Sequence, residues 1–558
     1  MRRFLVCLFT LCTAAFSQSK FDVADVHVSP KSTSANVNMR GGLMRGGRYE
    51  LHNATMVDLV RTAYGVVPDR VVGGPAWLET DRFDIVAKGP ADATPDSLKE
   101  MLQAVLAERF SLVVHKDDRP LPAWALTAGK KPQLREADGT GEQGCKTATS
   151  GGGRGGGPGT APPVLTVTCR SITMAAFAEA TRTMGGASIY LNGNPVVDQT
   201  GLKGLWDFEF KMSPLRIMAP NDVENITIFD AVDKQLGLKL QLQKLPLPVI
   251  VVDGVNQKPT GNAPGVTQTL PPAKPPEFEV ADVKPSDPAN PGGGFGIQPG
   301  GRVNLRGMTL KTMIMQAWSL NGNDPIPGAP KWLETDRFDI IAKMASAEPA
   351  VSASVSPAGA PPAAQVDIDS IWLALRALLA DRFKLTTHYE DQSVPVYALT
   401  AVKPKLTKAD PANRTSCKSP GIISLLAAPA AGGATPTMAL TCQNITMAQL
   451  ADRLRNLSTG DIDHPVVDAT GLEGTWDFVL NWSPKIVGLM TTARGNAESA
   501  ARQAGGDAPG SAAAASDPGG GITMLQAMEK QLGLKLELQK RTMPVLVIDH
   551  VEQKPTEN

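Results

Sequence analysis

The chain has 558 residues, of which 42% are hydrophobic, and its 55 basic residues balance 55 acidic residues. That length and hydrophobic content suffice for two or more domain cores, so the composition excludes a chain that is disordered throughout. Because the formal net charge is zero, no global field favours nucleic acid or an anionic membrane surface as a partner.

The N-terminus has the pattern of a signal peptide. Arg2 and Arg3 precede an apolar run from Phe4 to Phe16, and small residues follow at the end of that run, up to Ser17. The run is shorter than the roughly 18 apolar residues that a membrane helix needs, and no later stretch approaches that length. We therefore expect an exported protein, periplasmic or extracellular, with no transmembrane segment in the mature chain.

Internal repetition is the most informative feature of the sequence. Five segments occur twice in the same order: FDVADV from Phe21 and FEVADV from Phe278, WLETDRFDI from Trp77 and Trp332, AERF from Ala107 and ADRF from Ala380, PVVD-x-TGL from Pro195 and Pro465, and QLGLKL from Gln235 and Gln531. Similar segments, VVDGVNQKPTGN and VIDHVEQKPTEN, also close the two copies.

Five prolines lie between the copies, from Ala263 to Pro276, and such a segment forms a stiff, extended spacer rather than a core. The predicted organisation is a signal peptide at 1–17, a first copy at 18–262, a Pro-rich linker at 263–277 and a second copy at 278–558.

The two copies differ in length because of three low-complexity insertions. These are Gly151–Pro163, which is Gly-rich, and Ala345–Ala364 and Thr491–Gly521, which are rich in Ala, Gly, Pro and Ser. None can bury much apolar area, so we expect surface loops. The GGGRGGGPG run lacks the Gly-Lys-Ser/Thr of a phosphate-binding loop, and we reject that interpretation.

Four cysteines remain after removal of the predicted signal peptide, two in each copy: Cys145, Cys169, Cys417 and Cys442. They lie at matching places on either side of a variable loop, and thiols pair in the oxidising conditions that exported proteins meet. We predict the disulfides Cys145–Cys169 and Cys417–Cys442, each contributing about 3 kcal/mol in the chain-entropy model. Two cysteines without a histidine pair make a poor zinc site.

Threonines flanked by apolar residues mark the starts of three helices in each copy. They are Thr55, Thr173 and Thr227 in the first copy and Thr309, Thr446 and Thr523 in the second. A threonine hydroxyl at this position accepts a hydrogen bond from a free N–H of the first helical turn. Strand-like runs flank these helices at 48–53, 164–169, 236–243 and 247–255, so the unit is predicted to be helix, strand, strand.

A fourth helix in each copy is indicated by periodicity alone. The apolar residues that fall on one face are Leu98, Met101, Leu102, Val105 and Leu106 in the first copy, and Ile371, Leu375, Leu378 and Leu379 in the second. Alternation from Phe110 to His115, and from Phe383 to His388, then predicts a strand with one buried face. The predicted fold class is α+β, with two homologous domains that each pack helices on one face of a mostly antiparallel sheet.

No familiar catalytic motif is present: the sequence contains no His-Glu-x-x-His helix, Gly-x-Ser-x-Gly elbow, Walker loop or dinucleotide fingerprint. We therefore predict no catalytic, cofactor-binding or metal-binding residues and no cofactor. Only His115 and His388, among six histidines, are equivalent in the two copies. We interpret each as a partly exposed strand histidine that bonds a neighbour, with a catalytic or ligand role as the alternative.

Several acidic residues also recur. The first-copy residues are Asp81, Asp84, Asp198, Asp207 and Asp253, and their second-copy counterparts are Asp336, Asp339, Asp468, Asp477 and Asp549. Paired carboxylates can perform acid–base chemistry, but turn caps and ion pairs with Arg82 and Arg337 explain these positions more simply. Asp-x-Thr-Gly, a motif also found in aspartic peptidases, is interpreted as a turn, and the Trp-Asp-Phe triplets as core or turn anchors.

The repeated segments together resemble a soil-associated family of uncharacterised exported proteins that is expanded in acidobacteria. The motifs that carry the resemblance are F-[DE]-V-A-D-V, W-L-x-[ST]-D-R-F-D-I, P-V-V-D-x-T-G-L, Q-L-G-L-K-L and the closing V-I-D-H-V-E-x-P-T-x-N, and they cover nearly the whole mature chain. The resemblance implies a tandem duplication of a domain that commonly occurs once, and it implies no activity. Some relatives carry the domain beside a membrane metallopeptidase, a region absent from this sequence.

Three functional hypotheses follow. The first is a non-enzymatic module of the envelope or extracellular space that binds a protein, peptide or polysaccharide, with two linked copies raising avidity. The second is a hydrolase of unfamiliar design that uses the repeated carboxylates with His115 or His388. The third is a sensory partner of an envelope metallopeptidase system.

Overall fold

The computed structural model describes most of the chain, and the predicted signal peptide at 1–17 lies outside the described residues. The described ranges are 19–30, 39–139, 143–150, 164–181, 184, 187–191, 193–213, 226–272, 276–287, 294–298, 301–320, 324–344, 351–352, 368–410, 414–418, 437–457, 462–483 and 522–557. Of the three low-complexity insertions, only Val351–Ser352 falls within these ranges.

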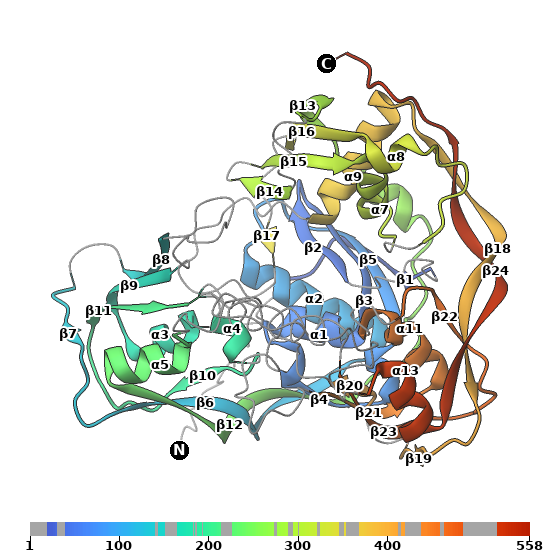
Figure 1. Ribbon diagram of the computed structural model, residues 1–558. Coiled ribbons are helices and arrows are strands. Elements are labelled where there is room, and N and C mark those ends of the chain that lie inside the picture. The colour runs from blue at the N-terminus through green and yellow to red at the C-terminus, as the bar shows by residue number, and fades with distance from the viewer. Residues whose placement is uncertain are drawn as a thin grey trace, which may run out of the picture.

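Each copy consists of two small lobes joined by a long two-stranded ribbon (Figure 1). Lobe 1A packs its helices on a sheet of order β1-β5-β3-β2. Its elements are β1 (Val23–Val28), β2 (Arg40–Arg45), β3 (Arg48–Thr55), α1 (Met56–Tyr64), β5 (Arg82–Lys88) and α2 (Pro95–Phe110), with 3₁₀ turns at Pro68–Arg70 and Ala76–Glu79.

Lobe 1B repeats this layout in the second half of the copy, on a sheet of order β7-β11-β9-β8. Its elements are β7 (Arg135–Glu136), β8 (Gly144–Ser150), β9 (Val164–Ile172), α3 (Met174–Ala180), α4 (Ala187–Tyr190), β11 (Trp206–Met212), α5 (Ile228–Asp230) and a π-helical turn at Ala231–Gln235.

The ribbon that joins lobes 1A and 1B is made of β6 (Val113–Ala128) and β12 (Leu238–Gly254), which pair antiparallel along their whole length. A short strand adds to it in parallel at each end: β4 (Val71–Gly73) beside β12, and β10 (Val196–Asp198) beside β6. The two strands predicted at 236–243 and 247–255 are therefore one continuous strand. Likewise, Phe110 ends α2, and the following strand begins only at Val113.

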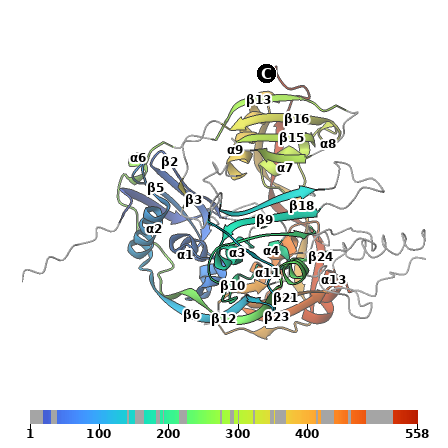
Figure 2. The ribbon, with the colours of Figure 1, turned by 90° about the vertical axis from the view of Figure 1, so that its left-hand side faces the viewer.

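The second copy has the same plan, in lobes 2A and 2B (Figure 2). Lobe 2A comprises β13 (Phe278–Pro285), β14 (Gly294–Gln298), β15 (Arg302–Thr309), α7 (Leu310–Ala317), α8 (Trp332–Thr335), β16 (Arg337–Met344) and α9 (Ile368–Arg382). Lobe 2B comprises β19 (Thr407–Lys408), β20 (Ser416–Lys418), β21 (Met438–Ile445), α11 (Met447–Leu457), β23 (Trp476–Trp482), α13 (Met524–Ala527) and a π-helical turn at Met528–Leu532. Their ribbon is β18 (Thr386–Ala401) with β24 (Leu534–His550) and the short parallel β22 (Val466–Asp468).

The helices and cores form as the sequence predicted. All six marked threonines accept a hydrogen bond from the third residue of their helix through the side chain. Thr94 caps α2 in the same way, although its sequence context did not identify it. The predicted apolar faces of α2 and α9 are buried, with Leu98, Leu106 and Leu375 fully excluded from solvent. The mixed α+β class with two repeated domains is thus confirmed.

Each copy is itself a doubled unit, since lobes A and B share the order strand, capped helix, strand, helix and long ribbon strand. A short parallel strand follows the capped helix in lobes 1A, 1B and 2B, and lobe 2A has none among its described residues. In copy one the ribbon pairs Pro120 with Pro246 near its midpoint, so the two halves are related by an approximate two-fold rotation there. A left-handed residue ends the second helix of every lobe: Ser111 in 1A, Gly237 in 1B, Lys384 in 2A and Gly533 in 2B. The repeating units within each copy are these four lobes, which are larger than the helix-strand-strand unit that the sequence suggested.

The two copies also contact each other. β17 (Val351–Ser352), from the low-complexity insertion of copy two, pairs antiparallel with β2 of lobe 1A, and Figure 1 shows it there. Arg414 of lobe 2B forms an ion pair with Glu79 of lobe 1A at 2.7 Å and donates a hydrogen bond to the carbonyl of Val71. In the predicted linker, Val266–Thr269 forms the short helix α6, and Arg48 bonds the carbonyl of Pro271. These contacts hold the copies and the linker together.

Candidate functional site

Four of the recurring aspartates perform one structural role, once in each lobe. Two residues before each cap threonine of the first helix, the backbone adopts a left-handed conformation at a β-bulge, with φ between 44° and 60°. The N–H of that residue donates to an aspartate on the neighbouring strand. The donor and acceptor pairs are Asn53 with Asp84 at 2.8 Å, Ser171 with Asp207 at 2.9 Å, Gly307 with Asp339 at 2.8 Å, and Asn444 with Asp477 at 2.6 Å.

The protonation of these carboxylates follows from their hydrogen bonds. Burial acts to raise the pKa of Asp84, but hydrogen bonds from His52, the N–H of Asn53 and Ser29 outweigh it and hold the pKa well below its ordinary value. The same balance between burial and the bonds from Ser286 and the N–H of Gly307 lowers the pKa of Asp339. A carboxylate that must stay ionised to hold a bulge is a poor general acid.

The other acidic residues also have bonding partners, and these differ from the predicted ion pairs. Arg82 and Arg337 each donate to a bulge carbonyl, of Asn53 and Gly307, rather than to a carboxylate. Asp81 and Asp336 instead accept from the amides of Gln257 and Gln553, which belong to the closing motif of each copy. The recurrence of that closing motif is thereby explained, because it docks back onto lobe A.

The Asp-x-Thr-Gly segments form turns, as interpreted from the sequence. Asp198 accepts hydrogen bonds from both the N–H and the hydroxyl of Thr200, at 2.8 and 2.7 Å, and Asp468 accepts the same pair from Thr470. Each turn separates the short parallel strand from the next strand of lobe B, and the Phe208 that follows in copy one is buried in the core. A peptidase role is not supported by this geometry.

The two equivalent histidines each bond an aspartate across their ribbon. Nδ1 of His115 lies 2.8 Å from Oδ2 of Asp253, and Nδ1 of His388 lies 2.8 Å from Oδ1 of Asp549. All four side chains are about half exposed, between 41% and 52%. Within the described part of the chain, neither imidazole bonds a hydroxyl or thiol that could act as a nucleophile. The pairs therefore resemble cross-strand contacts that stabilise a ribbon more than parts of a catalytic triad.

A second group of histidines surrounds Asp84 in copy one only. His52 and His27 place ring nitrogens 3.3 and 3.7 Å from Oδ2 of Asp84, and His27 also lies 3.6 Å from Asp25. In lobe 2A the corresponding residues are Arg306 and Lys284, so permanent cations take the places of both histidines near Asp339. Among the described residues, no group of three or more His, Cys, Asp and Glu side chains has an arrangement suited to a metal ion.

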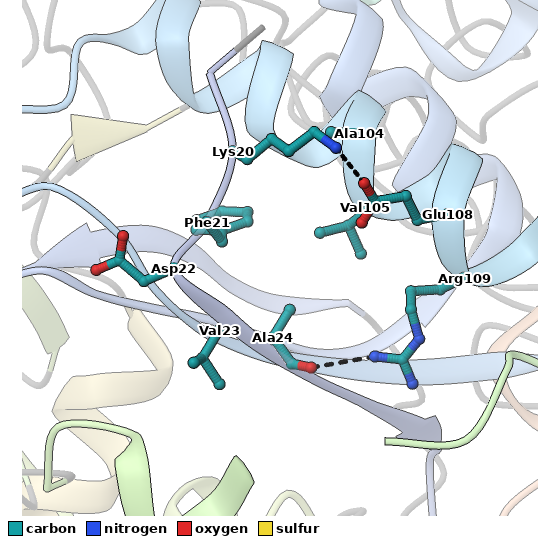
Figure 3. Close-up of a pocket in the computed structure, with 9 residues that line it drawn as sticks. All are labelled: Lys20, Phe21, Asp22, Val23, Ala24, Ala104, Val105, Glu108 and Arg109. Atoms are coloured by element: carbon teal, nitrogen blue, oxygen red, sulfur yellow. Dashed lines mark hydrogen bonds and ion pairs between the residues drawn. The ribbon is translucent and has the colours of Figure 1, made fainter. Parts of the chain in front are cut away.

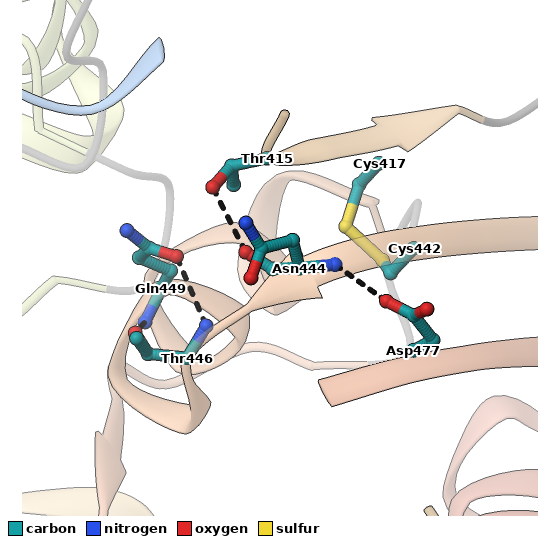
Figure 4. The surroundings of a disulfide bond; sticks show 7 residues. All are labelled: Thr415, Cys417, Cys442, Asn444, Thr446, Gln449 and Asp477. Atoms are coloured by element: carbon teal, nitrogen blue, oxygen red, sulfur yellow. Dashed lines mark hydrogen bonds between the residues drawn. A yellow bond between two sulfur atoms is a disulfide. The ribbon is translucent and has the colours of Figure 1, made fainter. Parts of the chain in front are cut away.

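Both predicted cysteine pairs stand at bonding distance, as cross-strand partners in the B lobes. Cys145 on β8 lies opposite Cys169 on β9, and Cys417 on β20 lies opposite Cys442 on β21 (Figure 4). Cys169 and Cys442 are buried, so each bond attaches an edge strand to the lobe core. Figure 4 also shows the bulge residue Asn444 beside the disulfide, with its N–H directed at the aspartate of the next strand.

One shallow pocket of about 160 Å³ lies between the start of β1 and the end of α2 (Figure 3). Lys20 and Glu108 form an ion pair across it, and Arg109 donates to the carbonyl of Ala24 at 3.1 Å and also bonds Thr260. The charged groups of Lys20, Glu108 and Arg109 are thus already engaged by the chain itself.

Exposed leucines on the ribbons are a feature that sequence reasoning missed. The alternation Leu238, Leu240, Leu242 predicts one core-facing side, and Leu238 is indeed fully buried. The ribbon, however, extends past the edge of its lobe, so Leu242 is 53% exposed, opposite Trp124 of the partner strand. The equivalent Leu538 of copy two is 59% exposed, opposite Tyr397. The repetition of this leucine in both copies was the sequence signal that could have identified it.

Comparison with known proteins gives one match. The model of a family described as protein of unknown function (DUF3738) matches residues 57–255 and 311–551, one range in each copy. Searches of the curated proteins and of the solved structures found no match. No helix in the described ranges combines the length and apolarity needed to cross a membrane.

Proposed function

Because the chain belongs to the DUF3738 family, whose function is unknown, we propose that it is an exported, non-enzymatic binding module whose two copies engage a ligand together. Export to the periplasm or the extracellular space is supported by the predicted signal peptide and by two cysteine pairs at bonding distance. An acidobacterial origin belongs to the same proposal and rests on the sequence resemblance alone.

The observation that carries this proposal is the same exposed apolar contact at equivalent places on the two ribbons. Leu242 and Leu538 are more than half exposed, and each faces an aromatic residue on the paired strand. Trp124 is fixed there by a 3.0 Å hydrogen bond from its Nε1 to the carbonyl of Leu191, and Tyr397 by a 3.2 Å bond to Asp463. Trp and Tyr are enriched among the residues that dominate binding interfaces, so a fixed aromatic group at the same place on both ribbons supports a binding surface there.

The hydrolase hypothesis is weakened by the roles of the residues it requires. Asp84, Asp207, Asp339 and Asp477 hold bulges, while Asp198 and Asp468 hold turns. Each ribbon histidine bonds one exposed aspartate without a bonded nucleophile in the described residues. The repeated carboxylates are thus distributed over separate structural tasks.

The proposal is tested with the full-length, oxidised protein immobilised as bait for envelope and culture fractions of its source. The amount of each fraction component that the bait retains is compared between the wild type, Leu242→Asp, Leu538→Asp and the double variant. If both copies bind one multivalent ligand, each single variant weakens retention and the double variant loses it by about 100-fold or more. Val479→Asp is the matched control, because Val479 is a 50% exposed strand residue away from the ribbons. Retention that is unchanged in the double variant would reject these surfaces as the binding sites.

A further inference from the structure

The chain itself shows that the outer edge of one lobe accepts an added strand. In lobe 1A the sheet order ends at β2, and β17 extends it by pairing Val351 with Met44 and Ser352 with Leu43. β17 comes from a distant part of the sequence, in copy two. Addition of an extended segment to a sheet edge is also how several peptide-binding domains hold their ligands.

The corresponding edge of lobe 2A is β14. The two edges are equivalent, because β2 and β14 each form a hairpin with the strand that leads into the capped first helix. Met44 of β2 lies opposite Tyr49, and Ile297 of β14 lies opposite Val303, the matching positions of the next strand. Among the described residues, β14 is the last strand of its sheet.

The side chains on the two edge strands also differ in exposure. Met44 is 3% exposed, whereas Ile297 is 40% exposed and its neighbour on the same face, Phe295, is 41% exposed. The Phe295 ring lies 5.0 Å from that of Trp372 on α9, so these side chains continue the core face beyond the last strand. β14 has the sequence GFGIQ, with no charge, proline or bulge of the kinds that usually protect an open edge.

We infer that the outer edge of β14 is a peptide-binding site that takes one extended segment of a partner protein by antiparallel strand addition. The segment that suits it is uncharged and consists of small and β-branched residues, as does the sequence around β17, AVSASVS. Main-chain hydrogen bonds would hold the added strand, and its β-branched side chains would cover Phe295 and Ile297. This inference rests on the proposed binding function and names one kind of partner for it.

The test uses the full-length oxidised protein and a fluorescein-labelled peptide of residues 350–356, AVSASVS. Fluorescence anisotropy should show saturable binding of one peptide per chain. The Phe295→Lys/Ile297→Lys variant should bind at least about tenfold more weakly, since charges on an edge oppose pairing. Val280→Lys is the matched control, because Val280 is 65% exposed on β13, the opposite edge of the same sheet, and binding there should be unchanged.

Two further measurements keep the test decisive if the lysine variant is unstable. A peptide with proline at the positions of Val351 and Ser352 cannot complete the strand and should bind at least about tenfold more weakly to the unaltered protein. The same two prolines placed in the protein should free the edge of β2 and raise the stoichiometry to two peptides per chain. Absence of peptide binding up to about 1 mM, or equal binding by Phe295→Lys/Ile297→Lys, would overturn the inference.

A second copy of the chain is the other possible occupant of the β14 edge, and sedimentation of the protein alone tests for such a dimer. A dimer that Ile297→Lys dissociates would show that the edge serves self-association, and would overturn the inference. If the inference about β14 fails but the ribbon leucine variants still lose retention of their ligand, the proposed function remains intact. Conversely, peptide binding at β14 with no effect of the leucine variants would reject the ribbon surfaces alone.

Discussion

Lobes 1A and 2A have the same scaffold and different surfaces. Both place an aspartate under a left-handed bulge, begin α1 or α7 at a capping threonine, and stack one phenylalanine on another at the end of the second long helix. They differ at the surface. β17 covers the edge of β2, whereas β14 is the last strand of its sheet among the described residues, and Lys284 and Arg306 replace the histidines near Asp84. Duplication has therefore retained the groups that determine the fold and changed the groups available to ligands.

The largest effect on stability is expected from the edge-to-face phenylalanine pair that both lobes share. Phe83 and Phe338 are 1% and 3% exposed, and their rings lie 4.9 and 5.0 Å from those of Phe110 and Phe383 in edge-to-face geometry. Phe83→Ala and Phe338→Ala should each lower the free energy of unfolding by about 3–5 kcal/mol, because each leaves a cavity in an equivalent core. Denaturant unfolding checks this. If only one of the two substitutions lowers the free energy of unfolding, the two cores are not equivalent.

A smaller loss is expected from the bulge aspartates. Asp84→Ala and Asp339→Ala each leave a bulge N–H without its acceptor and should destabilise their lobes by about 1–3 kcal/mol. Asp69→Ala is a suitable control for copy one, since its side chain is 80% exposed. If Asp84→Ala behaves like this control, as judged by denaturant midpoints, the bulge bond contributes nothing to stability.

Acid should remove part of that contribution. The folded state holds the pKa of Asp84 below its ordinary value, so it binds fewer protons than the unfolded state in acid. The stabilisation is complete above the unfolded value of about 3.9 and is lost as the pH falls through the folded value. The free energy of unfolding, measured at a series of pH values between about 3 and 7, should decline below about pH 4. The decline should be less steep in Asp84→Asn. Identical slopes would contradict the assignment.

The smallest effect is expected at the covered edge. Proline at both Val351 and Ser352 removes the amide that faces β2, whichever of the two it is, and should cost about 1 kcal/mol or less, because the strand is short. Hydrogen exchange should then accelerate in β2 and remain unchanged in β14. Unchanged exchange in β2 would show that β17 does not cover it.

The sequence predicted the parts of the fold that depend on local chemistry. The six threonine caps, the apolar faces of α2 and α9 and the Asp-x-Thr-Gly turns all arise from residues within one turn or one helix. The pairing of cysteines followed from their duplication and spacing. The continuous strand β12 was missed because Pro246, between the two predicted strands, looks like a break, although the antiparallel pair accommodates it opposite Pro120.

The features bearing on function depend on distant contacts that no local pattern reveals. His115 meets Asp253 from 138 residues away, and the role of Asp84 depends on the N–H of Asn53 across the sheet. The run at 236–243 was predicted to be a strand, but only the length of the ribbon relative to the lobe exposes Leu242. Residues 351–352 carry no strand signal of their own, and the edge they cover belongs to the other copy.

Hydrogen exchange of the full-length oxidised chain tests the central claim, that one scaffold recurs with altered edges, most directly. We predict protection of the amides of Asn53, Ser171, Gly307 and Asn444 in all four lobes, together with protected amides in β2 and rapidly exchanging outward amides in β14. Rapid exchange at one of the four bulge amides, or equal protection of β2 and β14, would contradict it.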